Sequence, residues 1–437
     1  MSTPLLTAIN THLQKGRSSF HTPGHKGRPQ LSTFNFQLST DITELPDTDS
    51  LFEAGGAIAE AERLAAQSYG AYRTLFSAGG CTLCIQAMLR LACKAGDTVI
   101  MGRNAHKSAV NTAALLDLQP VWLYPNSSLL YAPEAVEQAI LKHPEAAAVY
   151  LTTPDYHGRI SPINKISQLC RKHGIPLLVD RAHGSHLPFI SGAAELISGA
   201  DMYADSLHKT LPVLTSGAVL NIYNQSFAPL AKSAMSLFAS TSPSYLVLCS
   251  LDSAREWLDT HGKEELERTA LRVAKIRNLA AQLGMPPLNV PTDPCRLCLN
   301  TEPIGLSGHA AAEYLRSQGI EPELSDAQSV VLICTPFNTE ADFIRLESAL
   351  RGIKAANPIK NSAIYAWEAH TAHMSVREAA LALHQRISIH KAAGRICGET
   401  VSTCPPGIPI LMPGEKILEN DIIFCAACGI LEINVVK

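Results

Sequence analysis

Residues 175–184, IPLLVDRAHG, decide the fold. The apolar run lacks the alternation of a half-exposed strand, which is typical of a strand covered on both faces in a parallel sheet. It ends on Asp180, where a parallel sheet presents polar groups to a ligand. Similar runs lie at 97–101, 147–153 and 217–223, with a weaker one at 200–205. They alternate with helical patterns between about residues 55 and 225, so the sequence predicts an α/β domain.

The rest of the chain predicts an N-terminal arm at 1–50 and a smaller C-terminal domain at 286–437, on either side of the large domain at 51–285. The arm has a helical pattern near 5–13, a His/Gly/Pro-rich stretch at 21–27 and an acidic run at 41–49. An amphipathic helix between about 250 and 283 closes the large domain. A β-α-β pattern over 295–335 follows, then helices near 340–353 and 376–386 and a Pro/Gly-rich tail at 404–415.

Composition excludes several classes of protein. The chain has 437 residues, of which 46% are hydrophobic and 17% charged, with a net charge of −3. This is too apolar for a disordered protein, and the charge argues against a protein that coats nucleic acid or anionic lipid. The start has no secretory signal pattern, and no apolar run approaches the ~20 residues of a membrane helix. We therefore expect a cytoplasmic protein that binds neither membranes nor nucleic acid.

Three C-x-x-C pairs stand out among the cysteines: Cys81/Cys84, Cys295/Cys298 and Cys425/Cys428. A zinc site would need two such pairs close together, and these are far apart in the sequence. We predict buried thiols and no metal.

The candidate chemistry lies just after the predicted strands. If the strands are near neighbours, one rim of the sheet carries His106, Asp180, His183 and Lys209. Upstream, Ser77-Ala-Gly-Gly-Cys-Thr82 opens a helical segment, and free N–H groups at a helix start can bind a phosphate. Pyridoxal phosphate needs these groups: a lysine for its Schiff base, a carboxylate for its pyridine nitrogen and a phosphate anchor. Taken singly, Lys209 would be interpreted as a surface lysine and Asp180 as part of a structural ion pair. Their occurrence together behind a phosphate-binding turn favours a pyridoxal-phosphate site.

Several motifs resemble one family, the prokaryotic ornithine/lysine/arginine decarboxylases, in a compact form. The likeness runs through nearly the whole chain, in the same order as in the family. The motifs are SFHTPGHKG (19–27), RNAHKS (103–108), LVDRAHG (178–184), SLHKTL (206–211), TSPSY (241–245), SLD (250–252) and PPGIP…PGE (405–415).

The resemblance implies a pyridoxal-phosphate enzyme of fold type I, with a mainly parallel seven-stranded sheet and a smaller α+β domain. Lys209 would carry the cofactor, Asp180 would pair with its pyridine nitrogen, His106 would stack on its ring, and His183 would lie beside it. The other implied cofactor contacts are to the phosphate group. The resemblance also implies a homodimer or higher homo-oligomer in which Thr241 or Ser242 contacts the cofactor phosphate of the partner subunit. The implied phosphate contacts within one chain are Gly80, Cys81, Thr82, Ser206 and His208.

Three positions depart from the family pattern. Cys81 stands in the phosphate turn where relatives carry Ser or Thr, and a thiol is a weaker donor than a hydroxyl. Arg181 replaces the usual Glu, although strand alternation points it away from Asp180. Asp155 follows its strand where Ser or Thr is usual, which bears on the substrate pocket.

A basic substrate also needs a carboxylate for its distal nitrogen. Glu399 is the first candidate, Asp155 the second, and Glu44 and Asp47 of the arm follow. For each, a solvated carboxylate is the alternative. The loop with His21, His25 and Lys26 is either a lid over the site or a buried structural turn.

We therefore expect a lyase that decarboxylates arginine, lysine or ornithine to carbon dioxide and a polyamine precursor. Lys209, His106, Asp180 and His208 would be its catalytic residues, with Lys209 or His208 as the proton donor. The alternatives are another pyridoxal-phosphate reaction, such as transamination or aldol-type cleavage, and a catalytically silent regulatory paralogue.

Overall fold

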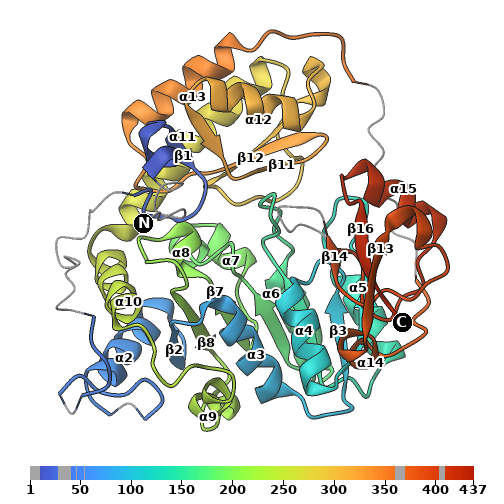
Figure 1. Ribbon diagram of the computed structural model, residues 1–437. Coiled ribbons are helices and arrows are strands. Elements are labelled where there is room, and N and C mark those ends of the chain that lie inside the picture. Colours follow the sequence, from blue (N-terminus) through green and yellow to red (C-terminus); the bar gives the residue numbers. More distant parts are fainter. Residues whose placement is uncertain (1–9, 28–40, 46, 54, 360–369, 403–408) are drawn as a thin grey trace, which may run out of the picture.

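The computed structural model describes residues 10–27, 41–45, 47–53, 55–359, 370–402 and 409–437. Figure 1 shows a large α/β part, a smaller α/β part above it and a C-terminal lobe beside them. The helix predicted near 5–13 lies mostly outside the described residues, although 10–14 are helical. The start of the Pro/Gly-rich tail also lies outside them.

The large part is built on a seven-stranded sheet of order β2-β8-β7-β6-β5-β3-β4. β8 is antiparallel to both of its neighbours, and the other pairings are parallel. The expected mainly parallel sheet is therefore confirmed, with β2 and β4 as strands that the sequence did not predict. The strands are β2 (Arg73–Ser77), β3 (Thr98–Gly102), β4 (Gln119–Leu123), β5 (Ala148–Thr152), β6 (Leu177–Asp180), β7 (Met202–Asp205) and β8 (Ala218–Ile222).

Helices cover both faces of this sheet, which explains why its central strands are apolar without alternation. Neighbouring residues such as Val99 and Ile100 belong to opposite hydrophobic clusters. One cluster includes residues of α3 (Gly80–Ala92), α4 (Lys107–Leu116) and α9 (Ala231–Ser236). The other includes residues of α2 (Ala57–Tyr69), α5 (Pro133–Lys142), α6 (Ile163–Lys172), α7 (Ala193–Leu196) and α10 (Tyr245–Trp257).

The predicted helix at 250–283 is longer and interrupted. α10 passes through a π-helical turn, Leu258–Gly262, into α11 (Lys263–Gln282). Because α10 already starts at Tyr245, this helical stretch begins before the predicted boundary. Residues of α11 pack into the core of the smaller part, so the stretch joins the two parts.

The smaller part has a core of its own around β9 (Arg296–Asn300) and β12 (Ser329–Ile333), which pair antiparallel. α12 (Gly308–Ser317) and α13 (Glu340–Gly352) cover it, and β11 (Leu324–Ser325) extends the sheet. The arm joins this part, since β1 (Ser18–Phe20) pairs parallel with β10 (Ile320–Pro322). The loop after β1 is thereby held beside the small domain.

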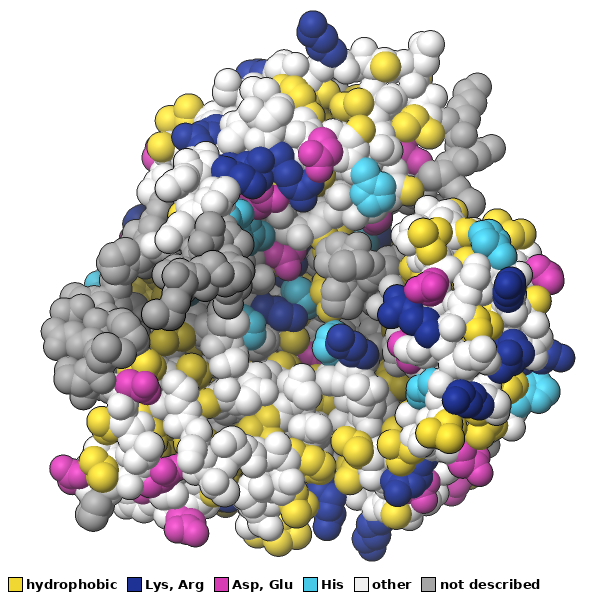
Figure 2. Space-filling view, in the orientation of Figure 1, with side chains coloured by type: hydrophobic (Ala, Val, Ile, Leu, Met, Phe, Trp, Pro, Cys, Tyr) yellow, Lys and Arg dark blue, Asp and Glu magenta, His cyan; other side chains and the backbone are white. Residues whose placement is uncertain are grey.

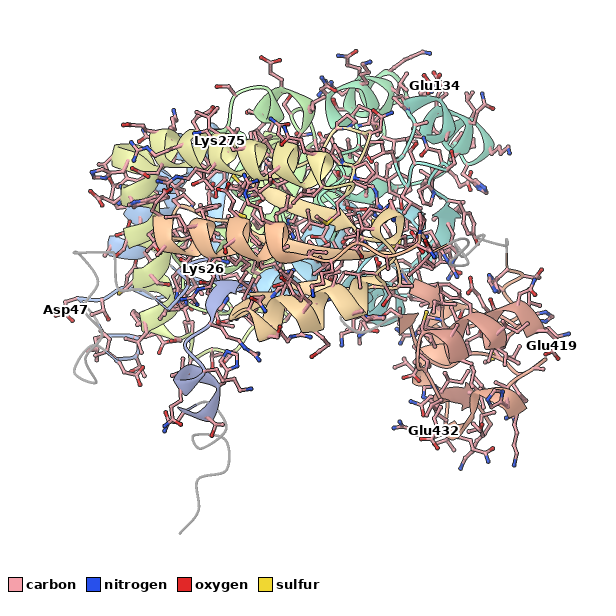
Figure 3. The ribbon with its side chains drawn as sticks, turned by 90° about the horizontal axis from the view of Figure 1, so that it is seen from above. Lys26, Asp47, Glu134, Lys275, Glu419 and Glu432 are labelled. Atoms are coloured by element: carbon pink, nitrogen blue, oxygen red, sulfur yellow. The ribbon has the colours of Figure 1, made fainter. Side chains whose placement is uncertain are left out.

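The C-terminal lobe has a fourth hydrophobic cluster, separate from the third, so residues 286–437 contain two cores. Figure 3 shows the lobe, marked by Glu419 and Glu432, projecting from the body. The predicted helix at 376–386 is wrong at its end, because α14 (Val376–Leu381) stops and 384–388 form a strand paired with β16. The lobe's other elements are β13 (His384–Ser388), β14 (Val401–Ser402), β15 (Pro409–Leu411), α15 (Glu419–Ala427) and β16 (Glu432–Val436).

A buried ion pair fastens this lobe to the large domain. The Arg103 guanidinium donates two hydrogen bonds to the Glu415 carboxylate, at 2.5 and 2.8 Å, and a third to the Ile410 carbonyl oxygen at 3.0 Å. Arg103 and Glu415 are 0% and 2% exposed. The neighbouring α14 packs on α4, so the lobe is fixed by both charge and packing.

Candidate active site

Lys209 is the third residue of α8 (Leu207–Thr210), which follows β7 after the single residue Ser206 at the carboxyl edge of the sheet. Its Nζ is 3.0 Å from Nε2 of His183 and 5.7 Å from the centre of the Tyr156 ring. Burial lowers the pKa of the Lys209 amine, and the charge of Asp180 acts against that shift. The lowered pKa makes the uncharged amine, the state in which it is a nucleophile, easier to reach than in a solvated lysine.

Asp180 ends β6 and is 1% exposed. Its carboxylate accepts hydrogen bonds from the Ala182 N–H at 3.0 Å and the Tyr150 hydroxyl at 3.2 Å. Burial raises the pKa of Asp180, while the charge of Lys209 and these hydrogen bonds lower it. These two donors and the weaker Cys81 thiol, 4.0 Å from Oδ1, are all neutral and only partly stabilise a buried carboxylate. The position therefore favours a further cationic partner such as a protonated ring nitrogen.

His183 lies between Lys209 and an arginine of the small domain. Arg296 Nη2 donates to the His183 carbonyl oxygen at 3.2 Å and lies 3.4 Å from Nδ1 of its ring. Because arginine can only donate, Nδ1 is the acceptor and Nε2 carries the proton that faces Lys209. Burial, then the charges of Lys209 and Arg296, lower the pKa of His183, so its ring is neutral.

Arg296 is a site residue that the sequence did not indicate. It begins β9, is 1% exposed and comes from the small domain. Its sequence context is that of any residue starting a strand. Only the packing of the small domain on the large one brings it to His183.

His106 stands at the N-cap of α4, where its Nδ1 accepts a hydrogen bond from the Ser108 N–H at 3.2 Å. The same nitrogen lies 2.8 Å from the Ser108 hydroxyl. Burial lowers the pKa of His106 to about 4, and the charge of Lys209 adds to this effect. A neutral ring fixed through one nitrogen is suited to lie against a flat aromatic ligand.

The predicted phosphate turn joins β2 to α3. Gly80 has a φ of 71°, a value that favours glycine, and its N–H donates to the Ser216 carbonyl oxygen at 2.8 Å. Cys81 follows with its Sγ 4.0 Å from Asp180 Oδ1, and Thr82 is exposed on the first turn of α3. The N–H groups of this turn have no partner within the helix, so the backbone can bind a phosphate without a hydroxyl at Cys81.

Ser206 and His208 flank the start of α8. The Ser206 hydroxyl lies 3.2 Å from Nδ1 of His208, which is also 3.2 Å from the Gly217 carbonyl oxygen. Burial lowers the pKa of His208, and the Gly217 contact raises it. This pairing leaves Nε2 of His208 as the nitrogen available to a ligand.

Thr241 and Ser242 are exposed, in the segment before α10. Ser242 lines a small hollow together with Gly79 of its own chain's phosphate turn. The structure thus brings Ser242 to that turn in one chain; the reach of either residue to a partner's phosphate stays a prediction.

Arg181 lies away from Asp180, as strand alternation predicted. Its Nε and Nη2 donate to the Asp205 carboxylate at 2.6 and 2.7 Å, and its guanidinium is 4.2 Å from the centre of the Tyr203 ring. Asp205 also accepts from Asn221 Nδ2 at 2.8 Å. Arg181 therefore belongs to a buried ion pair inside the domain.

The carboxylates predicted for the distal nitrogen are already engaged or remote. Both oxygens of Asp155 accept from Arg159, at 2.7 and 2.8 Å. Both oxygens of Glu399 accept from Asn434, at 2.8 and 3.0 Å. In Figure 3 Asp47 lies at the margin of the molecule, apart from Lys26, and it is exposed, whereas Glu44 is half-buried.

The loop at 21–27 is tied to the small domain. Lys26 is 8% exposed and its Nζ donates to the carbonyl oxygens of His21 at 2.6 Å and Ile333 at 3.0 Å. Burial lowers its pKa to about 8. These contacts favour the buried structural turn over a mobile lid. His25 Nδ1 accepts from the Gly27 N–H of the same loop at 3.0 Å.

One group of potential metal ligands occurs among the described residues: His186, Asp293 and Cys295, all buried. Asp293 Oδ1 already accepts from His186 Nε2 at 2.9 Å and from the Cys295 N–H at 2.8 Å. Arg296 lies 3.7 Å from the other oxygen, and a guanidinium there disfavours a second cation. The described cysteines are free thiols. The prediction of buried thiols is wrong for Cys428, which is exposed at the C-terminal end of α15, and the absence of a metal stays a prediction.

The residues at this rim fit pyridoxal phosphate. Asp180 offers a buried carboxylate for a ring nitrogen, Lys209 a buried amine for an aldehyde, and the first turn of α3 a set of N–H groups for a phosphate. Figure 2 shows a hollow between the three parts of the molecule, where histidine, basic and acidic side chains gather. No helix among the described residues is long and apolar enough to span a membrane.

Comparison with known proteins gives a consistent family. A family model described as "Orn/Lys/Arg decarboxylase, major domain" matches residues 3–285, and one described as "Orn/Lys/Arg decarboxylase, C-terminal domain" matches residues 361–426. Arginine decarboxylase of Bacillus anthracis is 32% identical over 453 residues, which cover 96% of this chain and 92% of that protein. Constitutive lysine decarboxylase of Escherichia coli is 23% identical over 315 residues, which cover 64% of this chain and 44% of that protein.

The likeness extends to solved structures. The structure of the E. coli constitutive lysine decarboxylase matches with a TM-score of 0.73 at 17% identity, covering 100% of this chain and 82% of that one. A serine palmitoyltransferase solved with pyridoxal phosphate has a TM-score of 0.60 at 14% identity, covering 77% of this chain and 86% of that one. The expected fold is confirmed.

Proposed function

The chain belongs to the Orn/Lys/Arg decarboxylase family, and from this premise we propose that it removes the α-carboxylate of a basic amino acid as carbon dioxide. The product is the corresponding amine, a polyamine precursor. Arginine is the first choice of substrate, because arginine decarboxylases are relatives that match over most of their length. Lysine and ornithine are the alternatives within the family's name.

The observation that carries this proposal is the position of Lys209, with its Nζ 3.0 Å from His183 Nε2 on the same rim as buried Asp180. The enzyme is a pyridoxal-phosphate decarboxylase, and its cofactor supplies the sink for the electron pair of the breaking carbon–carboxylate bond. Asp180 would keep the ring nitrogen protonated through its charge. His106 would hold the ring in place, and the first turn of α3 would bind the phosphate.

Proton transfer falls to groups beside Lys209. The Lys209 Nζ can hold and release a proton because burial lowers its pKa. His183 donates from Nε2, so it stabilises the uncharged amine or a developing negative charge at the same position. His208 is the second candidate. Its Nδ1 donates to the Gly217 carbonyl oxygen, so Nε2 delivers a proton to the substrate α-carbon only when the ring is doubly protonated.

We further propose a cytoplasmic homodimer as the minimum assembly. Support comes from Thr241 and Ser242, which are exposed next to the phosphate turn and so free to contact a second copy. Sedimentation of the holoenzyme tests this; a monomer with full activity would contradict it.

The direct test is amine formation by the purified holoenzyme. Arginine, lysine and ornithine are supplied separately, and agmatine, cadaverine and putrescine are quantified by mass. We expect one dominant amine, absent with Lys209→Ala. A wild-type protein that binds the cofactor and forms none of the three amines would contradict the proposal.

A further inference from the structure

Glu323 joins β10 to β11 on the small domain and is partly buried. Its Oε2 accepts one hydrogen bond, from the Thr22 N–H at 2.8 Å. Within the described ranges it forms no ion pair, although Glu321, two residues earlier, is paired with both Arg17 and Arg316. A partly buried carboxylate with a single neutral donor has capacity for a cation.

The loop after β1 places this carboxylate close to Lys209. Thr22 contacts Glu323, and two residues later the Gly24 N–H donates to the His208 carbonyl oxygen at 2.7 Å. Gly24 lies so close to α8 that an added Cβ would be 2.7 Å from the Leu211 backbone nitrogen. Only the bend from Thr22 to Gly24 therefore separates the Glu323 carboxylate from the helix of Lys209.

The same loop is fixed to the small domain. The Thr335 hydroxyl donates to the Gly24 carbonyl oxygen at 2.8 Å, and Asn338 Nδ2 donates to the Ser19 carbonyl oxygen at 2.9 Å. Lys26 lies nearby, but its ammonium donates to the carbonyl oxygens of His21 and Ile333. Glu323 is thus held in place, while the nearest lysine of the loop is directed to other acceptors.

The charge of Glu323 acts on the same space as the catalytic groups. Burial is the main cause of the lowered pKa of Lys209 and the raised pKa of Tyr156. Glu323 raises the pKa of both groups. It also acts against the burial that lowers the pKa of His208. These directions agree with the contacts of Thr22 to Glu323 and of Gly24 to His208, which bring the Glu323 carboxylate to the side of the site where α8 lies.

We propose that Glu323 binds the distal cation of the substrate and makes the enzyme selective for basic amino acids. This inference rests on the proposed decarboxylation. Glu323 differs from the carboxylates that the sequence suggested, because both oxygens of Asp155 and of Glu399 already accept hydrogen bonds. A guanidinium or ammonium group of the substrate would supply a positively charged partner for the Glu323 carboxylate. A neutral substrate side chain would leave the carboxylate without an ion pair.

The test compares Glu323→Gln with Glu321→Gln in the holoenzyme. Glutamine keeps an oxygen for the Thr22 N–H, so the loop stays in place while the charge is lost. Arginine, lysine, ornithine and the neutral analogue norleucine are assayed, and the bound-cofactor absorbance reports an intact site. We expect Glu323→Gln to lower kcat/KM for the best basic substrate about 100-fold, mainly through KM, with norleucine nearly unaffected. Glu321→Gln should stay within about 2-fold of wild type.

Glu323→Asp provides a second readout if the glutamine variant fails to bind cofactor. The shorter carboxylate should shift the preference toward a substrate longer by one methylene, raising the lysine-to-ornithine ratio of kcat/KM. If Glu323→Gln still discriminates between basic substrates and norleucine as wild type does, the role of Glu323 is overturned while the proposed function stands. The same follows if Glu323→Asp leaves the lysine-to-ornithine ratio of kcat/KM unchanged. A cofactor-loaded wild type that forms no amine from any basic amino acid overturns the proposed function, and this inference with it.

Discussion

At the carboxyl rim of the large sheet, Asp180 is the last residue of β6 and Lys209 lies on the short helix after β7. Arg296 and Glu323 approach the same site from the small domain. The rim presents groups suited to the cofactor, and the small domain presents an arginine and a carboxylate suited to positioning and selectivity. The two regions differ in what positions their groups. The rim groups are positioned by the ends of strands, whereas Arg296 and Glu323 are positioned by the packing of the small domain on the large one.

The largest effect is expected when the amine at the rim is removed, because this tests whether the rim groups carry the chemistry. Lys209→Ala should lower the rate of amine formation by more than about 10⁴-fold, because no other described amine lies beside His183. The measurement is product by mass, together with the absorbance of bound cofactor. Lys172→Ala is the control, since that lysine pairs with Glu137 at the surface. Substantial activity in Lys209→Ala would remove this residue from the chemistry.

A smaller effect should come from the carboxylate of the rim. Asp180→Asn loses the charge, and its single amide oxygen can accept from only one of the Ala182 N–H and the Tyr150 hydroxyl, which bond to different oxygens of the carboxylate. We expect kcat to fall roughly 100- to 1000-fold. Asp201→Asn is matched to it, because Asp201 lies at the opposite edge of the sheet and accepts from the Leu177 N–H and Asn224. Equal losses in the two variants would show a structural effect in both.

The neutral ring of His106 predicts a pH dependence of stability. Its folded pKa of about 4 lies below the usual 6.5, so between these values the unfolded chain binds more protons. The contribution of the neutral His106 ring to the free energy of unfolding is complete above pH 6.5 and is lost as the pH falls toward 4. Between pH 7 and pH 5, the free energy of unfolding should fall by about 2 kcal/mol more in wild type than in His106→Gln. Urea unfolding measures this, and equal slopes in the two proteins would refute it.

How much of this could be predicted from sequence follows from the same comparison. His106, Asp180, His183 and Lys209 were predictable together, since each comes soon after a strand of a buried sheet. Strands β2 and β4 were missed because they are the edges of that sheet, and RTLFS and QPVWL carry polar residues and a proline that central strands avoid.

Residues from the small domain carried no such local signal. Glu323 lies in the unremarkable segment EPELS, and only the loop contact at Thr22 and the placement of β10 bring it toward Lys209. Glu399 was favoured by its position before the Pro/Gly-rich tail. Both oxygens of the Glu399 carboxylate accept from Asn434 of β16, one from its backbone N–H and one from its side-chain amide.

The smallest expected effect comes from a substitution of Glu399 in the C-terminal lobe, to be compared with Glu323 of the small domain. Glu399→Gln should change KM for the preferred substrate by less than about 2-fold, because its carboxylate is hydrogen-bonded to Asn434 and glutamine can retain part of that contact. Initial rates over a range of substrate concentrations provide the measurement. A rise in KM as large as that of Glu323→Gln would return Glu399 to the substrate site.

The central claim is that the rim groups release carbon dioxide from a basic amino acid. Arginine labelled at its carboxyl carbon, given to the holoenzyme, tests this most directly. The account predicts one labelled carbon dioxide and one agmatine for each arginine consumed, with no 2-oxo acid. If 2-oxo acid forms and the label stays in it, the reaction is transamination and the claim is contradicted.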